Sequence, residues 1–265
     1  RPTLFPYTTL FRSDGFYTVA DFESFDSKSR TWKLKEGVVD SSPLSDTPRP
    51  GNAKFKKLTP VDPNSTNPYQ LTEADRTVIG NTTPKFSGGF GLNATYKGFD
   101  MSMFFNFMYD FDVLNANKIM LTTWADNKEN NFLMDIASDK RWRNFDDMGN
   151  EIRYSPEVLA EFNKNATMWN PTSIGRPICM SYAVEDGSFL RLNSATLGYT
   201  LPSVWTKKVG LSKVRFYVSG NNLFTLTGYS GYDPEVNIAT GLTPNIDYNR
   251  YPRSRTYTFG AQLTF

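Results

Sequence analysis

The stretch FSGGFGLNATYKGFDMSMFFNFMY, residues 86–109, alternates apolar side chains with small or polar ones at a period of two. From Phe86 to Tyr96 one face carries the aromatic and aliphatic residues, and the other carries serine, glycine, asparagine and threonine. The alternation returns from Phe99 to Tyr109, and Lys97-Gly98 between the two runs is a two-residue turn sequence. Because β-strands have this period, the stretch predicts an antiparallel hairpin.

Three further strands are predicted near the C-terminal end, at residues 188–201, 214–224 and 255–265. In SFLRLNSATLGYTL (188–201) the alternation is clean only in the second half. In RTYTFGAQLTF (255–265) it continues without an error up to Phe265. The chain is therefore expected to be an all-β protein.

The lengths of the connections between these strands alternate. The connections at 97–98 and after Pro202 are short, whereas segments 111–186 and 227–252 are long. In outer-membrane barrels short turns face the periplasm and long loops face outside. Strands of about 9–11 residues are enough to span a bilayer, and no run of 18 apolar residues is present. The pattern predicts the C-terminal part of an antiparallel transmembrane β-barrel, an incomplete barrel with long extracellular loops.

The remaining segments carry weaker signals. Within 111–186, Ser155 and Pro156 predict the start of a short helix that runs to Lys164. Residues 16–25 and 30–37 are candidate strands, and 43–68 has the composition of a loop. Thr72 to Asp75 matches a capping box for one helical turn.

The first 13 residues, RPTLFPYTTLFRS, resemble translated sequencing-adapter read-through. We therefore expect residues 1–13 to be an artefact and residues 14–265 to form the barrel portion. The alternative is a genuine strand–turn–strand.

Composition excludes several classes of function. The chain has no histidine and one cysteine, Cys179, so the commonest general base, the commonest metal ligand and a Cys–His pair are missing. The carboxylate pairs 146–147 and 185–186 lie in loop-like segments, where solvated surface charge is the expected role. The net charge of +2 is too small to indicate nucleic-acid binding. We expect no enzymatic activity, no cofactor and no metal site.

Four segments together resemble the SusC/RagA-type TonB-linked outer-membrane transporters, and they occur in family order. They are DRTVIGNTTPKFSGGFGLNATYKGFDMSMFFNF (75–107), DGSFLRLNSATLGYTLP (186–202), VRFYVSGNNLFTLTGYSGYDPEVN (214–237) and YPRSRTYTFGAQLTF (251–265). The resemblance implies a 22-stranded barrel around an N-terminal plug, of which this chain would supply the final strands. It further implies import of glycans or peptides across the outer membrane of a Gram-negative bacterium. A SusD-like surface lipoprotein would act as the lid, and TonB would supply energy through an N-terminal region absent here.

Aromatic residues in the long loops are the candidate ligand or partner contacts, because their rings can stack on sugar faces. They are Trp124, Trp142, Trp169, Tyr229 and Tyr232. The alternative is that they pack the loops or form an interfacial aromatic belt. On the last strand, the residues Tyr257, Phe259, Leu263 and Phe265 resemble the signal read by the barrel assembly machinery, and outer-membrane lipid is the expected surrounding.

A second function remains open at this point. A secreted or surface all-β carbohydrate-binding module would show similar alternation, but it would turn its apolar faces inward.

Overall fold

The computed structural model describes residues 10–44, 46–123, 133–136, 139–173, 178–236 and 245–265. Within these ranges the chain divides into two compact units. Of the described residues, the sheet unit comprises those within 80–113 and 185–265, and the loop unit comprises those within 10–79 and 114–184. Each unit is described by itself.

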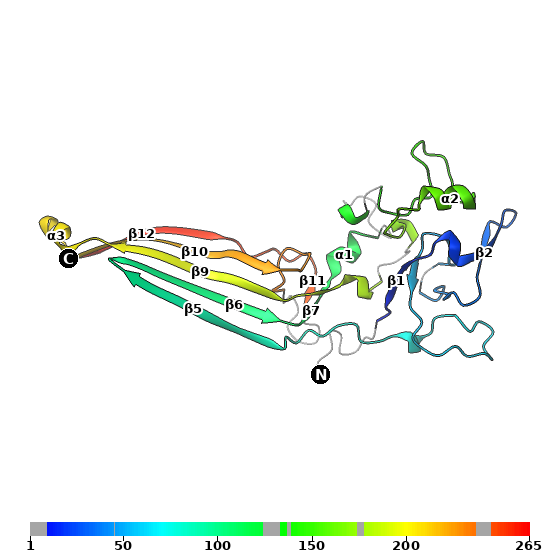
Figure 1. The fold of residues 1–265 in the computed structure, drawn as a ribbon, viewed down its shortest axis with the longest axis horizontal. Coiled ribbons are helices and arrows are strands. Elements are labelled where there is room, and N and C mark those ends of the chain that lie inside the picture. The colour runs from blue at the N-terminus through cyan, green and yellow to red at the C-terminus, as the bar shows by residue number, and fades with distance from the viewer. Residues whose placement is uncertain (1–9, 45, 124–132, 137–138, 174–177, 237–244) are drawn as a thin grey trace. The chain divides into compact units, whose positions relative to one another are not determined.

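Five long antiparallel strands form the sheet unit (Figure 1). In sheet order β12-β10-β9-β6-β5, each strand lies beside the next long strand along the chain. Their bounds are β5 Phe86–Tyr96, β6 Phe99–Tyr109, β9 Phe189–Thr200, β10 Lys213–Thr227 and β12 Thr256–Thr264. The predicted hairpin and the three predicted C-terminal strands are confirmed. Among the described strands, β5 and β12 each pair on one side only, so the sheet is an incomplete barrel wall.

The short connections lie together at one end of this sheet. Lys97 and Gly98 have φ values of 44° and 90°, as a two-residue hairpin turn requires. The second short connection holds α3 (Ser203–Thr206) and the 3-10 turn η6 (Lys207–Val209). The Thr200 N–H donates to the Gly98 carbonyl at 2.8 Å, which places the two connections side by side. The two short connections that the sequence predicts therefore lie at the same end of the sheet.

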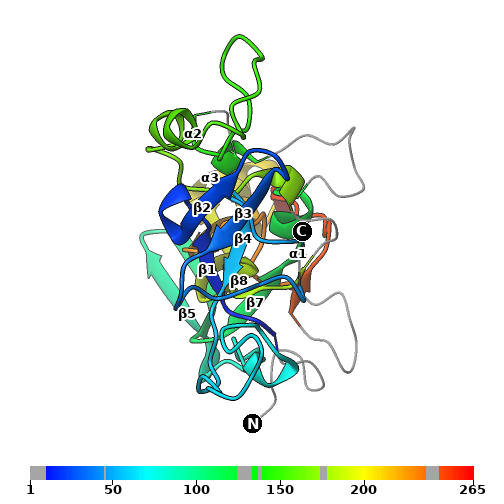
Figure 2. The ribbon, with the colours of Figure 1, turned by 90° about the vertical axis from the view of Figure 1, so that its right-hand side faces the viewer.

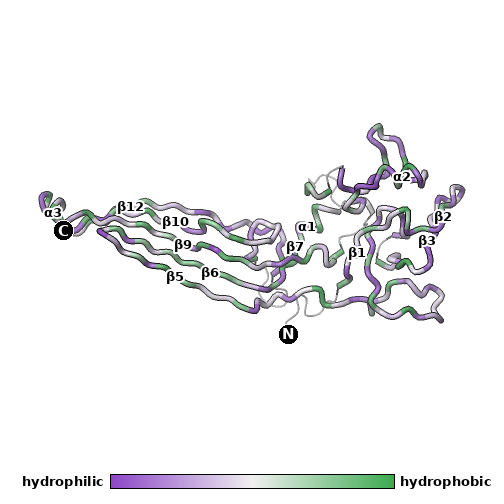
Figure 3. Tube along the Cα trace, viewed as in Figure 1, coloured by the Kyte–Doolittle hydropathy of each residue, from purple (hydrophilic) through white to green (hydrophobic). Residues whose placement is uncertain are grey.

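The strand register places apolar side chains on one face of all five strands. Phe90 lies opposite Phe105, Phe105 opposite Leu192, and Val218 opposite Phe259. Hydropathy alternates along each strand accordingly (Figure 3). The side chains on this face are largely exposed, with Phe259 at 80% and Tyr96 at 69%. An apolar face left open to the surroundings is the arrangement of a lipid-facing barrel wall.

A β-bulge explains why the alternation in 188–201 is clean only in its second half. Between β6 and β9 the register steps from Phe104↔Ser194 to Phe105↔Leu192, so Asn193 is the extra residue. A bulge shifts all later side chains by one position. Leu190 and Leu192 before the bulge thus share a face with Ala195 and Leu197 after it.

The opposite face of the sheet is polar. Arg215 of β10 donates from Nε and Nη2 to the two carboxylate oxygens of Asp100 in β6, at 2.9 and 2.5 Å. This bidentate pair crosses β9, the strand that lies between β10 and β6. A face with paired charges fits the polar lumen of a barrel.

Short strands, short helices and 3-10 turns form the loop unit (Figures 1 and 2). It contains two small antiparallel sheets, β1 (Ser13–Phe16) with β4 (Ala53–Phe55) and β2 (Phe22–Asp26) with β3 (Thr31–Leu34). Its helices are α1 (Ala116–Met120), α2 (Pro156–Phe162) and the 3-10 turns η1 (Val19–Asp21), η2 (Glu73–Asp75), η3 (Met134–Ile136), η4 (Pro171–Ser173) and η5 (Ser181–Ala183). A third small sheet, formed mainly by residues of the sheet unit, has the order β11 (Ile246–Asp247), β7 (Asp112–Asn115), β8 (Val184–Asp186).

Among the described residues, two hydrophobic clusters pack the loop unit. One is built around Phe11, Phe55, Trp169 and Met180, and the other around Trp142, Ile152 and Leu159. Segment 111–186 was expected to be loop, but its described part packs against residues from the first 80. No helix among the described residues is long and apolar enough to cross a membrane.

Several local predictions need correction. Residues 16–25 form no continuous strand, because Thr18 and Asp21 cap the 3-10 turn η1 through a 2.7 Å bond from the Thr18 N–H. The predicted loop 43–68 contains strand β4. Helix α2 begins at Pro156 as predicted but ends at Phe162, and the Ser155 side chain makes no capping hydrogen bond. The capping box from Thr72 to Asp75 is confirmed.

Candidate functional site

The structure separates the candidate loop aromatics by exposure. Trp142 and Trp169 are each only 3% exposed, and Tyr229 is 6% exposed. Tyr232 is 84% exposed. Trp124 lies outside the described residues. Of the described candidates, only Tyr232 offers a whole ring to a ligand or partner.

Tyr229 belongs to the core of the sheet unit. It packs with Phe111, Phe189 and Val236, and its hydroxyl donates to Asp247 at 2.7 Å. Burial, followed by the bond to Asp247, raises the pKa of Tyr229 well above its usual range. The side chain thus anchors the segment after β10.

The four residues singled out on the last strand all lie exposed on the apolar face or directly after it. Tyr257, Phe259 and Leu263 are 61%, 80% and 52% exposed, and Phe265 is 90% exposed. They form one continuous apolar stripe along β12.

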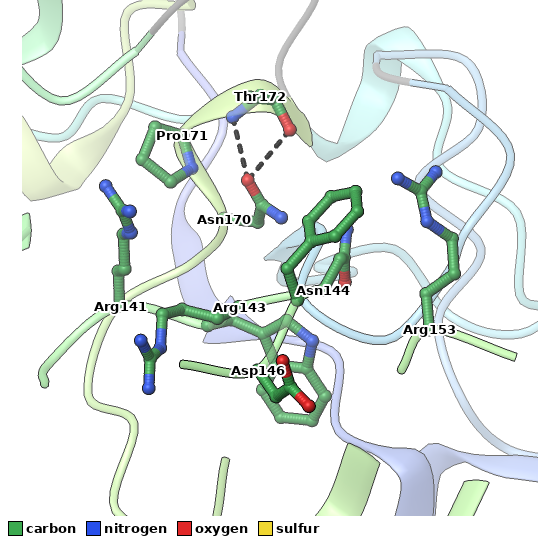
Figure 4. Close-up of a pocket in the computed structure, with 10 residues that line it drawn as sticks. Arg141, Arg143, Asn144, Asp146, Arg153, Asn170, Pro171 and Thr172 are labelled. Carbon is green, nitrogen blue, oxygen red and sulfur yellow. Dashed lines mark hydrogen bonds between the residues drawn. The ribbon is translucent and has the colours of Figure 1, made fainter. Parts of the chain in front are cut away.

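A cavity of about 410 Å³ lies next to Trp142 in the loop unit (Figure 4). A smaller cavity of about 110 Å³ shares four of its lining residues and adds Arg49 and Asp46 among others. The larger cavity is lined by Arg141, Trp142, Arg143, Asn144, Phe145, Asp146, Arg153, Asn170, Pro171 and Thr172.

Backbone hydrogen bonds between distant segments build this wall. The Trp142 N–H donates to the Met168 carbonyl at 2.8 Å, and the Asn170 N–H donates to the Gly51 carbonyl at 2.8 Å. The Asn163 side chain accepts from the Arg143 N–H at 2.7 Å and donates to the Arg143 carbonyl at 2.9 Å. Segments near residues 51, 142, 163 and 170 are therefore tied into one rigid frame.

Trp142 fits against a backbone that only glycine allows. Gly51 has φ 88°, and a Cβ built on it would lie 2.2 Å from Trp142 Cδ1. The close approach lets the indole ring bury completely at the base of the cavity wall.

Two of the three arginines in the wall have carboxylate partners. Arg143 pairs with Asp147 at 2.8 Å and lies over the Phe162 ring, and Arg153 pairs with Glu151 at 2.5 Å. Among the described residues no carboxylate pairs with Arg141. Burial, and then the charge of Arg143, lowers the pKa of Arg141.

The arginines of this cavity were missed in the sequence, although a signal is present. Arg141-Trp142-Arg143 is a short polar–apolar–polar alternation, which turns the tryptophan inward and leaves the arginines at the surface of the frame. Among the described residues there is no group of histidine, cysteine, aspartate and glutamate side chains that could hold a metal ion. Cys179 is exposed.

Taken together, the meander of long strands, its exposed apolar face and its polar reverse define the class of protein. The sheet unit is part of the wall of an antiparallel β-barrel of the outer-membrane type.

Comparison with known proteins agrees with this class. TonB-dependent receptor P3 of Formosa agariphila is 35% identical over 202 residues, covering 74% of this chain and 18% of that protein. TonB-dependent receptor SusC of Bacteroides thetaiotaomicron is 38% identical over 88 residues, covering 32% and 8%. No family model matches. The chain belongs to the SusC/RagA-type TonB-dependent receptors, and it spans about a fifth of the length of the first curated relatives it matches.

Solved structures support the same fold. The RagAB peptide importer in its open-open state matches with a TM-score of 0.54 and 22% identity, covering 97% of this chain and 22% of that one. A structure of the RagAB peptide transporter matches with a TM-score of 0.56 over the same shares.

Proposed function

We propose that this chain is the C-terminal part of a TonB-dependent importer of glycans or peptides in the outer membrane of a Gram-negative bacterium. The observation that carries the proposal is the exposed apolar face shared by all five long strands, backed by a polar face with the Arg215–Asp100 pair. Such a sheet is stable where lipid covers one side and a polar lumen the other. No catalytic step is part of the proposal.

The alternative, a soluble carbohydrate-binding module, fits less well. A sandwich buries the apolar face of each sheet against a second sheet about 10 Å away. Here Phe259, Tyr257 and Phe216 on that face are more than half exposed. The relatives are TonB-dependent receptors, which also favours the importer over the soluble module.

The proposal assigns partners as well. A SusD-like lipoprotein would cover the outer end, and TonB would act through a region outside this chain. The exposed ring of Tyr232 is the best placed of the described candidate aromatics for a contact with ligand or lipoprotein. Trp142 and Trp169 would support such a contact indirectly, because their buried rings fix the conformation of the loops. The barrel assembly machinery would recognise the stripe on β12 that ends at Phe265.

Topology gives a direct test. In the full-length gene product, with Cys179→Ser as background, we would introduce Met148→Cys in the loop unit and Val209→Cys in the short connection. Both positions are strongly exposed, at 87% and 71%. A maleimide coupled to a large polyethylene glycol cannot cross the outer membrane. It should label the cysteine at 148 in intact cells, and the one at 209 only after the membrane is permeabilised.

Equal labelling of both positions in intact cells, or recovery of the protein in the soluble fraction, would overturn the membrane assignment. Co-purification tests the partner separately. An affinity-tagged gene product solubilised in mild detergent should bring down a surface lipoprotein, and growth on the imported nutrient should cease in a strain lacking TonB.

We also propose that residues 1–13 are not part of the natural protein. Resequencing the gene from genomic DNA tests this directly. The result matters for the fold, because Phe11 is buried in the loop unit. If residues 10–13 are confirmed as natural, they belong to that core.

A further inference from the structure

We propose that the cavity beside Trp142 binds an acidic sugar residue, whose carboxylate or sulfate group is held by Arg141 and Arg143. The inference rests on the proposed import function and names a chemical class of ligand for it.

The wall of the larger cavity is rich in arginine. Asp147 and Glu151 pair with Arg143 and Arg153, so the positive charge without a carboxylate partner among the described residues is that of Arg141. The aspartate that lines the cavity, Asp146, is already engaged, because its carboxylate accepts hydrogen bonds from the backbone of Met148 and from both the backbone and the side chain of Asn150. The Asp146 carboxylate is thus used within its own turn.

Arg141 lies in an unfavourable electrostatic environment. Its guanidinium is partly buried, stands near the like charge of Arg143 and has no carboxylate partner among the described residues. Each of these conditions raises the free energy of a cation. An oxyanion bound between the two guanidinium groups relieves all three at once, and a planar fork suits bidentate binding of a carboxylate or sulfate.

The hydrogen-bonding groups of the wall suit a sugar better than an extended peptide strand. One common way to bind an extended peptide is to pair it with free backbone groups at a strand edge. Four backbone groups of this wall are already used, since Trp142, Asp146 and Asn170 donate internally and the Asn144 carbonyl accepts from Ile152. Beside these, the wall offers side-chain amides, guanidinium groups and the ring of Phe145, which is 46% exposed. This combination suits hydroxyl groups and the apolar face of a sugar ring.

The volume of the cavity fits a small part of a longer oligosaccharide. A volume of about 410 Å³ lies at the lower end of the range for small-molecule sites. We therefore expect the cavity to hold one or two sugar units, with the rest of the oligosaccharide outside it.

Calorimetry on the full-length gene product in detergent tests the proposal. The probes are an oligogalacturonate, a sulfated galactan oligosaccharide and a neutral galactan oligosaccharide of equal length, together with a glutamate-rich peptide. We expect at least one acidic sugar to bind on the order of tenfold or more tightly than the neutral one, and the comparison of the two identifies carboxylate or sulfate as the anion. Arg141→Gln should remove most of that preference, Arg141→Lys should keep part of it, and higher salt should weaken binding.

Lys33→Gln is the matched control, because it also removes one positive charge from the loop unit but lies outside the cavity wall. Its affinity should equal that of the parent. The proposal fails if acidic and neutral sugars bind alike, if the peptide binds best, or if Arg141→Gln and Lys33→Gln behave the same while both retain the parent's thermal unfolding. These outcomes leave the labelling test untouched, so failure of the site and failure of the membrane assignment are distinguishable.

Discussion

Replacing Arg191 by methionine should loosen the segment that follows β10. Arg191 is almost fully buried on the polar face of β9, and its Nη2 donates to Asp233 at 2.5 Å. A second carboxylate, Glu235, lies 3.8 Å from its Nη1 and also pairs with Arg253 at 2.6 Å. The network ties β9 to the start of the long connection between β10 and β12.

The free-energy cost of Arg191→Met depends on the contacts that Asp233 and Glu235 retain in the variant. Removing one partner of a buried ion pair costs about 3–5 kcal/mol, because the other charge remains buried and unpaired. Glu235 keeps Arg253, and Asp233 keeps a hydrogen bond from the Glu235 N–H at 2.9 Å. We therefore expect the lower value, about 3 kcal/mol, which corresponds to an opening equilibrium roughly a hundredfold larger.

Hydrogen exchange followed by mass spectrometry measures this local opening. Amides of residues 229–236 in Arg191→Met should exchange roughly a hundredfold faster, while those of the β5–β6 hairpin stay unchanged. Arg253→Met is the control: its side chain is 41% exposed, so its loss should cost less than about 1 kcal/mol. Exchange in 229–236 that rises less than about fivefold, or rises equally across the whole sheet, would refute the reasoning.

Three other predictions follow from single contacts. Gly51→Ala should destabilise the loop unit by about 2 kcal/mol or more, seen as faster proteolysis, because the methyl group meets Trp142 at a positive φ. Burial alone would raise the pKa of Asp75, but hydrogen bonds, those from Thr59 foremost, outweigh it and hold that pKa well below its usual range. Its stabilisation is therefore complete above about pH 4 and is lost as pH falls further, and exchange in 56–76 should show this acid loss in the parent but not in Asp75→Asn. Phe259→Lys should lower the yield of assembled protein in the outer membrane, whereas Lys at the neighbouring inward position 258 should be tolerated, so equal yields would contradict the assigned faces.

The sheet unit was largely predictable because its information is local. Period-two alternation indicates which residues share a face of a strand. In a meander, the order of the strands in the sheet follows their order in the chain. The exception is the first half of β9, where Asn193 forms a bulge. The break in alternation there was visible in the sequence, but sequence alone does not tell a bulge from the end of a strand.

The loop unit was not predictable for the opposite reason. Its core joins Phe55, Ile136 and Trp169, which are far apart in the chain and lie in segments without a sustained period. The pairing of such segments depends on long-range contacts, and no local pattern announces them. A capping box was recognised at Thr72 to Asp75 but overlooked at Thr18 to Asp21, where a strand was predicted instead.

The loop tryptophans show how a functional expectation changes once burial is known. An exposed tryptophan can stack its ring on a sugar, but the ring of Trp142 is packed against Gly51 and against the cluster with Ile152 and Leu159. Its fixed position still matters, because it holds the two adjacent arginines on a rigid frame. Rigid placement of a charged group reduces the entropy lost when a ligand binds. In the proposed site, Trp142 would therefore support the contact and not make it, and Arg141 and Arg143 on either side would select for an acidic group.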